Sequence, residues 1–206
     1  MAKAYDCADS SALYDSLNWC PGTKTLPGFR PRVYFIPVAD IAAWPKLPKA
    51  GDDDAPSKMA DLAVLKGDFT LAADKTWRFI DCDSVRNNGT SETQGETGGK
   101  TFVDTLTLVF PATDAAASAL AAQLANERCA FLFQERAGKF RLVGSEAFGG
   151  ATIAPSLALG EGETGQVGTT FTVTGTTEVP MPYYTGKIET EDGDINGLDG
   201  SPVAEE

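Results

Sequence analysis

The residues of this chain whose types and spacing most resemble a chemical site lie near its C-terminal end. Residues 192–197 read Asp-Gly-Asp-Ile-Asn-Gly, which matches the first half of a calcium-binding loop of EF-hand type. Asp192, Asp194 and Asn196 would supply its oxygen ligands. A complete loop needs a bidentate glutamate at its twelfth position, where this sequence has Val203. These residues are therefore a weak calcium candidate, and we predict no metal or other cofactor.

The segment that contains this motif is strongly acidic. Residues 187–206 carry seven acidic residues and one lysine. A run of like charges repels itself and favours solvent. We therefore expect residues 187–206 to form a solvated acidic C-terminal extension, with weak calcium binding as the alternative.

Catalytic arrangements are scarce in this sequence. It contains no histidine, which removes the commonest general acid and base near neutral pH and excludes Ser-His-Asp and Cys-His arrangements. Two carboxylate pairs, Asp52 with Asp54 and Asp81 with Asp83, have a spacing that a carboxylate mechanism could use. Because their contexts indicate a solvated loop and a strand end, we expect that the protein is not an enzyme.

The cysteines do not form a recognisable metal or redox motif. Cys7, Cys20, Cys82 and Cys129 include no Cys-x-x-Cys pair, so a zinc site would need all four to converge. Cys82 and Cys129 lie in apolar, strand-like runs and are expected in the core. The pairing of Cys7 with Cys20 stays open.

Composition favours one folded domain that does not grip nucleic acid. The chain has 206 residues, of which 42% are hydrophobic, and a formal net charge of −12. Nucleic-acid readers need basic patches, so this protein would repel DNA. No apolar run approaches 18 residues, which argues against a membrane span. Residues 1–16 lack a continuous apolar segment, so we expect a protein made in the cytoplasm.

Hydrophobic patterning predicts a mainly β fold. An irregular, Pro- and Gly-rich arm, 1–31, precedes a β domain at 32–186. Residues 101–110 alternate with the period of two that a strand requires. Residues 113–126 form the one convincing helix, since alanine has the highest helix propensity. We predict a sandwich or flattened barrel of two antiparallel sheets with one flanking α-helix.

The helix is expected to join one hydrophobic core with the strands. Thr113 or Asp114 can cap its start, and Ala116, Leu120 and Leu124 form an apolar stripe along it. The predicted core comprises Phe102, Leu106, Leu108, Phe110, Leu120, Leu124, Phe131, Phe133 and Phe171.

Two uncharged or polar features suggest surfaces with a special use. Residues 86–100 contain no large apolar side chain and are predicted to be a loop three times longer than most hairpin loops. The expected strands also carry rows of threonine that face away from the core: Thr105, Thr107, Thr170, Thr172 and Thr174. Threonine has high β-propensity anywhere on a sheet, and the alternative is a smooth polar surface that lines a cavity.

Three segments resemble the tail tube (major tail) proteins of bacteriophages. They are the helix between two strands, "PATDAAASALAAQLANERCAFLF", the run "LVGSEAFGGATIAPS", and the closing strand "GETGQVGTTFTVTGTTEVPMPYY". The resemblance covers residues 65–186. It implies hexameric rings that stack into a hollow tube, in which four strands of each subunit build an inner barrel through which DNA passes unbound.

The resemblance also assigns partners and an inter-subunit element. Segment 86–100 matches the long loop that reaches a neighbouring subunit or ring, and its candidate contact residues are Arg86, Asn88, Glu92, Gln94, Glu96 and Lys100. The partners implied are further copies of this chain and other tail proteins, in the tail of the virion and away from any membrane. The threonine rows would line the lumen.

Two alternatives stay open. A carbohydrate-binding or adhesive β-sandwich would use Trp19, Trp44 and Trp77 for stacking on sugars and residues 192–197 for structural calcium. Another virion component, such as a tail terminator or a capsid cement protein, would share the fold class.

Overall fold

The computed structural model describes residues 14–49 and 55–203, and the predicted mainly β class is confirmed. A ten-residue helix, α2 (Ala115–Leu124), and two short 3-10 turns, η2 (Val38–Asp40) and η3 (Met59–Ala63), accompany the strands. The strands are β1 (Phe29–Pro37), β2 (Ile41–Ala43), β3 (Val64–Leu65), β4 (Thr70–Leu71), β5 (Arg78–Asp81), β6 (Asn88–Gln94), β7 (Thr101–Phe110), β8 (Arg128–Glu135), β9 (Phe140–Val143), β10 (Ala151–Ala158), β11 (Gly168–Thr177), β12 (Tyr183–Tyr184), β13 (Lys187–Thr190) and β14 (Gly193–Asn196).

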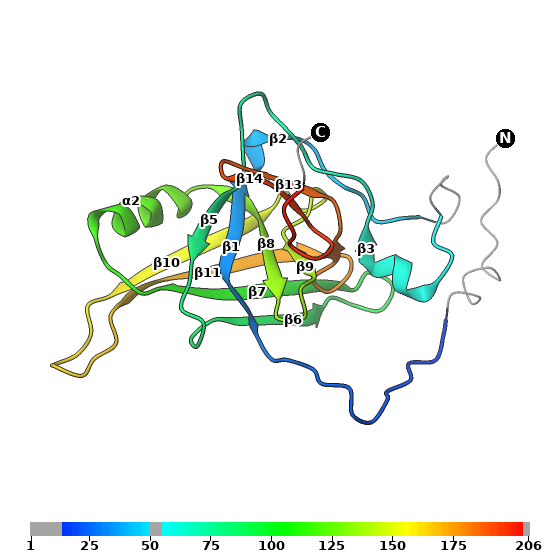
Figure 1. Ribbon diagram of the computed structural model, residues 1–206, viewed down its shortest axis with the longest axis horizontal. Helices are drawn as coiled ribbons and strands as arrows, with labels where there is room; N and C mark the ends of the chain where they lie inside the picture. The colour runs from blue at the N-terminus through cyan, green and yellow to red at the C-terminus, as the bar shows by residue number, and fades with distance from the viewer. Residues whose placement is uncertain (1–13, 50–54, 204–206) are drawn as a thin grey trace.

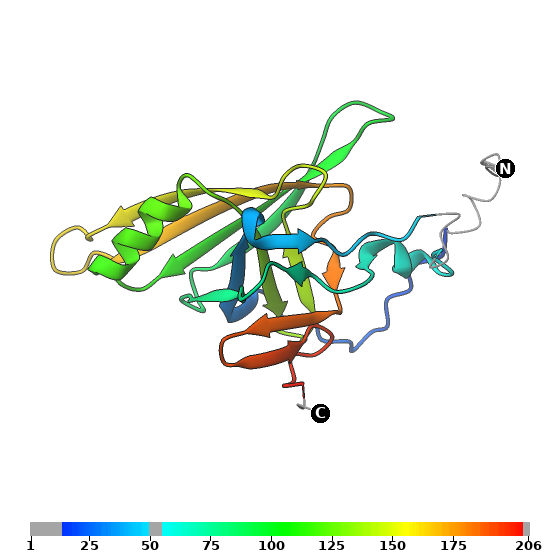
Figure 2. The same cartoon turned by 90° about the horizontal axis from the view of Figure 1, so that it is seen from above.

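Two layers of strands face each other across the core (Figure 1 and Figure 2). The first layer has the order β10-β11-β7-β6, and all its neighbours are antiparallel. In the second layer β1 lies between β5 and β8, and the sheet continues through β9, β12 and β3. A short pairing of β8 with β10, where Ala151 lies opposite Cys129, joins both layers into one curled sheet. Helix α2 flanks β10 and β11, so the predicted sandwich or flattened barrel with one flanking helix is confirmed, with the two layers joined in one curled sheet.

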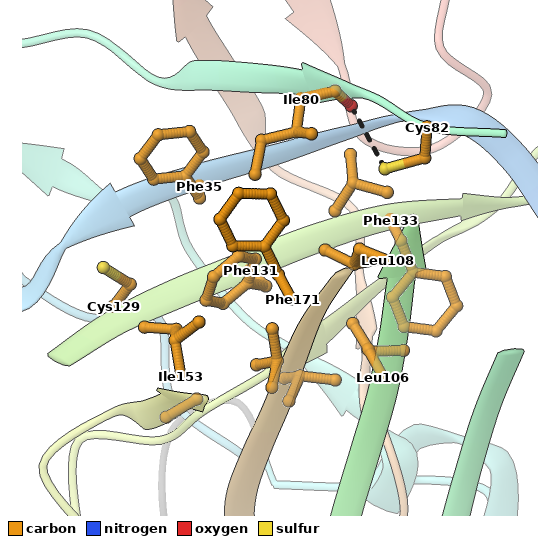
Figure 3. Packing of buried hydrophobic residues seen from close by; sticks show 14 of the residues in the cluster. Phe35, Ile80, Cys82, Leu106, Leu108, Cys129, Phe131, Phe133, Ile153 and Phe171 are labelled. Atoms are coloured by element: carbon orange, nitrogen blue, oxygen red, sulfur yellow. Dashed lines mark hydrogen bonds between the residues drawn. The ribbon is translucent and has the colours of Figure 1, made fainter. Parts of the chain in front are cut away.

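The space between the layers is filled by aromatic and branched side chains (Figure 3). Six predicted core residues are buried there: Leu106, Leu108, Leu124, Phe131, Phe133 and Phe171. Phe110 and Leu120 pack against them and are partly buried. The prediction is wrong for Phe102, which is partly exposed opposite Thr93 and close to the β6–β7 turn. Its strand face continues inward at Asp104, where the sequence has a carboxylate in place of an apolar residue.

A second apolar cluster lies on the outer face of the second layer. Along β1, Val33 and Phe35 face the first cluster, whereas Tyr34 and Ile36 face the second, as the strand pleat requires. The hairpin of β13 and β14 contributes to this cluster together with Trp77, which is almost completely buried. The molecule therefore has a third partial layer outside the two main ones.

The prediction that 187–206 is a solvated acidic extension is wrong for the part that the structure describes. Ile188, in β13, is fully buried in the second cluster, and Ile195, in β14, packs against it. The backbone N–H of Trp77 donates to the carbonyl of Glu189 at 2.8 Å. The acidic side chains occupy the alternate positions, so the composition of the segment concealed the inward-facing isoleucines.

Helix α2 agrees with the predicted helix 113–126 to within two residues at each end. Asp114 caps it, because its Oδ1 accepts a hydrogen bond from the N–H of Ala117 at 2.8 Å. The predicted apolar stripe is wrong at Ala116, which is exposed. The buried side is set by Ala117 and Leu124, whose spacing of seven residues returns to the same helix face.

The N-terminal arm is shorter than predicted. Residues 14–28 form no helix or strand, but β1 begins at Phe29, within the predicted irregular arm 1–31. Phe29 is buried between the layers against Phe133, with ring centroids 5.0 Å apart. This contact extends the strand beyond the proline at position 31.

Candidate functional site

Segment 86–100 is not a loop, and that prediction is wrong. Residues 88–94 form β6, which pairs along its whole length with β7, and a turn at 95–100 connects the two strands. Because β6 is rich in Thr, Ser and Asn and has no large apolar residue, its sequence lacks the hydrophobic alternation by which strands are recognised.

The candidate contact residues of this segment divide between three places. Asn88, Glu92 and Gln94 lie on one face of β6. Glu96 and Lys100 belong to the turn that follows it. Arg86 precedes the strand, and its Nε donates to the Oδ2 of Asp83 at 2.7 Å.

The five threonines of the predicted polar rows lie together on one face of the first layer. Thr172 lies opposite Thr107, and Thr174 lies opposite Thr105. The strands β6 and β10 extend this face on both sides. We call it the polar face, and its other members are Asn88, Thr90, Glu92, Gln94, Thr101, Val103, Val109, Thr152, Ala154, Ser156, Ala158 and Thr176. Glu92 is the one charged side chain among these residues, all of which are described.

Hydrogen bonds made by β7 show which residues of β6 direct their backbone N–H and C=O groups toward β7. Val109 donates its N–H to the Oδ1 of Asn87 and accepts from the N–H of Asp83, so its backbone groups point toward the β6 side. Backbone direction alternates along a strand. The odd-numbered residues of β7 therefore bond to β6, and their even-numbered partners in β6 point back to β7.

The outer edge of β6 is consequently free in the described chain. The N–H and C=O groups of Gly89, Ser91 and Thr93 point away from β7, and no strand among the described residues pairs with them. Unpaired edges of this kind are templates for pairing with another chain.

The outer edge of β10 is free by the same reasoning. The alternation places the even-numbered residues of β10 toward β11, so Ile153, Pro155 and Leu157 point their backbone outward. Pro155 agrees with this direction, because proline lacks an N–H and occurs where its nitrogen faces away from the paired strand. Within the described residues β8 covers this edge only at Ala151 and Thr152.

A buried carboxylate ties β6 to the rest of the first layer. Asp104 is fully buried and accepts hydrogen bonds from the hydroxyls of Ser91 and Thr177 and from the N–H of Met181. Burial raises the pKa of Asp104, while the bonds from Ser91 and Thr177 oppose that rise. The sequence pattern gave no signal for this network, because its members are far apart in the chain.

The raised pKa of Asp104 predicts a specific dependence of stability on pH. The folded protein holds this proton more tightly than the unfolded chain, whose aspartate has a pKa of about 3.9. The stabilisation is complete below that pH and is lost as pH rises through the raised folded pKa. In thermal melts across this window, wild type should lose stability relative to Asp104→Asn as pH rises.

Asp61 provides a control of opposite sign. Hydrogen bonds from Ser57 and Lys58 lower its pKa, so its stabilisation is present at neutral pH and is lost as pH falls through the lowered value. Wild type should therefore gain stability relative to Asp61→Asn as pH rises. The same sign of slope for both comparisons would contradict the assignment to Asp104.

The structure does not assemble the calcium candidate. Asp194 pairs with Lys187, with an Oδ2–Nζ distance of 3.0 Å, and Asn196 accepts the N–H of Leu198 at 2.9 Å. Asp192 lies in the turn between β13 and β14. The described residues contain no group of three or more His, Cys, Asp or Glu that could hold a metal ion.

The other candidate reactive groups are also separated or engaged. Asp81 forms a two-pronged pair with Arg32, with distances of 2.8 and 2.9 Å, whereas Asp83 pairs with Arg86. Asp52 and Asp54 lie outside the described residues. No two carboxylates of the predicted pairs are thus shown to share a site.

The described cysteines fit structural roles better than chemical ones. Burial raises the pKa of the Cys82 thiol and of the Cys129 thiol to about 12, so both are protonated and unreactive near neutral pH. Cys20 is exposed with a free thiol. Its proposed partner Cys7 lies outside the described residues.

Two of the three tryptophans are engaged in the packing of the second cluster. Trp44 and Trp77 both pack against Phe69 in the second cluster, with ring centroids 5.3 and 5.1 Å apart. Trp19, in the arm, is exposed. The arrangement therefore gives little support to the carbohydrate-binding alternative.

Comparisons with protein-family models, curated proteins and solved structures found no match to this chain. Within the described residues, no helix has the length and apolar character needed to cross a membrane.

Proposed function

We propose that this protein is a structural subunit of a bacteriophage tail tube, assembled as stacked hexameric rings in the tail of the virion. The observation that carries the proposal is the first layer: four antiparallel strands with an almost uncharged polar face and a free edge at each side. The sequence resemblance to tail tube proteins supplies the ring number and the stacking.

The directions of the two free edges suit a closed ring. Along the order β10-β11-β7-β6 the strands alternate in direction, so the first and the fourth are antiparallel. Rotation about an axis that runs roughly along the strands keeps the up or down direction of every strand. It brings β6 of one copy beside an antiparallel β10 of the next, which is the pairing that hydrogen bonds can complete. A heterologous contact of this type generates a ring when the rotation between copies closes.

Several registers set outward-pointing residues of the two edges opposite each other, and we choose the one that uses all three on each edge. It sets Gly89 opposite Leu157 and Thr93 opposite Ile153. Ser91 then faces Pro155, which accepts one hydrogen bond but donates none. The edge proline weakens the contact by one bond and also limits pairing with wrong partners.

This register implies a strand tilt that closed barrels adopt. Within one subunit Thr90 lies level with Thr152, whereas the proposed contact sets Thr90 opposite Ser156. The stagger of four residues is roughly 13 Å along the strands, against roughly 19 Å across four strands. The resulting tilt of about 35° lies at the lower end of the range of about 35–45° found in barrels.

The charge distribution suits a conduit for DNA. The polar face would line the lumen, and none of the residues that define it is a cation that could bind phosphate groups. Two arginines border it and are engaged: Arg86 pairs with Asp83, and Arg128 donates to the carbonyls of Phe148 and Gly149. The net charge of −12 produces a field that repels DNA. A genome could therefore pass through the ring without being retained.

Electron microscopy of the purified protein at high concentration tests this function. We expect negatively stained rings or tubes with a central hole. In a variant with Cys7 and Cys20 replaced by serine, Thr90→Cys and Ser156→Cys together should give disulfide-linked oligomers under mild oxidation, and Thr90→Cys alone should give none at that position. A protein that stays monomeric at every concentration would contradict the proposal.

A further inference from the structure

A large hollow opens beneath the free edge of β6, on the core side of the first layer. Its volume is about 900 Å³, comparable with sites that hold a small ligand. Leu26, Phe29, Val85, Phe133 and Met181 supply its apolar lining. Gly89 of β6 lines the hollow from above, and an added Cβ there would lie 3.0 Å from Cδ2 of Leu106, so the neighbouring side chain closes the space directly beneath the glycine.

The opposite edge of the layer ends in a hairpin with apolar side chains that its own chain does not cover. The β10–β11 connection projects beyond α2 (Figure 1). Leu157, on the core side of β10, and Leu159, just after the strand, are 45% and 74% exposed, and Val167, before β11, is 41% exposed. On its core side, this layer thus has exposed apolar side chains near the β10 edge and an unfilled hollow at the β6 edge.

We propose that the β10–β11 hairpin of one copy fills the hollow beneath β6 of the next copy, with Leu157 seated against Gly89. This contact rests on the proposed ring, because the register that matches the two edges also sets Leu157 opposite Gly89. Residues directly opposite in a ladder place their side chains on the same face. The side chain of Leu157 then points toward the hollow that Gly89 lines.

Charge also matches between the hairpin and the hollow. The hairpin tip carries Glu161 and Glu163 and no basic residue. The hollow is lined by three cationic residues, Lys24, Arg136 and Arg141, and one acid, Glu135. The proposed register brings the end of β10, and with it the acidic tip, toward the N-terminal end of β6, where Arg136 donates to the carbonyl of Ser84 at 3.2 Å.

The occupant is therefore a second copy of this chain and not a small molecule. A free ligand would have to supply an apolar group and a negative charge together, and the hairpin presents both on one element. Filling this space would also remove exposed leucine from solvent, which is favourable in proportion to the apolar area buried.

The test compares Leu157→Ser with Leu198→Ser, a control at another exposed leucine, 54% exposed, in the turn after β14. Sedimentation should show that Leu157→Ser raises the concentration for half-assembly by about tenfold or more, as loss of a central apolar anchor does. Leu198→Ser should stay within about twofold of wild type. Both monomers should melt close to wild type, since both leucines are exposed.

A charge exchange gives a second, independent readout. Glu161→Lys should weaken assembly at low salt, and adding Arg136→Glu should restore part of it. Rings that assemble equally well with Leu157→Ser and Leu198→Ser would overturn this contact and leave the proposed ring intact. Open chains that depend on Leu157 would support the contact and overturn the ring, and a wild-type protein without any assembly would overturn both.

Discussion

Replacing Thr93 with proline is expected to abolish ring formation and to leave the monomer folded. The N–H of Thr93 points away from β7 and has no strand partner among the described residues. Proline at this position removes a donor that the monomer does not use and that the proposed contact with Ile153 does use. The monomer should therefore keep its stability to within about 0.5 kcal/mol.

The effect on assembly is large because a ring repeats the same contact. Loss of one hydrogen bond costs about 1 kcal/mol at each contact, and a hexameric ring would contain six contacts. Because a closed ring needs all six contacts at once, the losses add up over the ring. Stained samples should therefore show no rings at the concentration where wild type assembles fully.

Two variants separate the lost donor from other effects. Thr93→Ala removes the same side chain and keeps the N–H, so it should assemble as wild type does. Glu92→Pro removes an N–H that points toward β7, so it should lower the melting temperature as well. Normal rings from Thr93→Pro would show that the outer edge of β6 is not an assembly surface.

The parts of the fold that the sequence predicts well are those with a strong hydrophobic period. β7 alternates along its full length, and the helix combines high propensity with a cap at Asp114. The threonine rows were also found, because they occupy the alternate positions of strands whose other face is apolar. These features depend on neighbours in the sequence and need no knowledge of the tertiary structure.

β6 could not be recognised because neither of its faces is apolar. The even-numbered residues of β6 contribute to the polar face. The odd-numbered residues include Gly89, which lines the hollow, and Ser91, which donates to the buried Asp104. Periodicity therefore has nothing to detect. The free edges are likewise invisible in the sequence, since an edge is defined by pairings of β7, β10 and β11 that are distant in the chain.

The prediction for the C-terminal segment was wrong because it used the charge of the whole segment and ignored the alternation of individual residues along its strands. Seven acidic residues in 187–206 suggest a solvated tail, yet two isoleucines at alternate strand positions decide where the segment lies. Ile188 is fully buried, and Ile195 lies opposite it in the β13–β14 hairpin. Charge averaged over a segment carries no information on which face of a strand the charges occupy.

Truncation after Gly186 is accordingly expected to destabilise the monomer, whereas a solvated extension could be removed without effect. The cut removes Ile188, the carbonyl of Lys187 that accepts from the Tyr184 hydroxyl at 2.7 Å, and the carbonyl of Glu189 that accepts from Trp77. It also uncovers Trp77 and Tyr184, which are among the largest fully buried side chains and belong to the second cluster.

A point substitution isolates the apolar part of this effect. Ile188→Ala should cost about 2–5 kcal/mol, as other buried large-to-small changes do, and should lower the melting temperature by roughly 4–20 °C. Leu198→Ala, at an exposed position of the same segment, should change it by about 2 °C or less. An unchanged melting temperature for Ile188→Ala would mean that the hairpin does not cover the second cluster in solution. If the loss is observed, residues 187–196 belong to the folded domain, because their isoleucines complete the cluster on the outer face of the second layer.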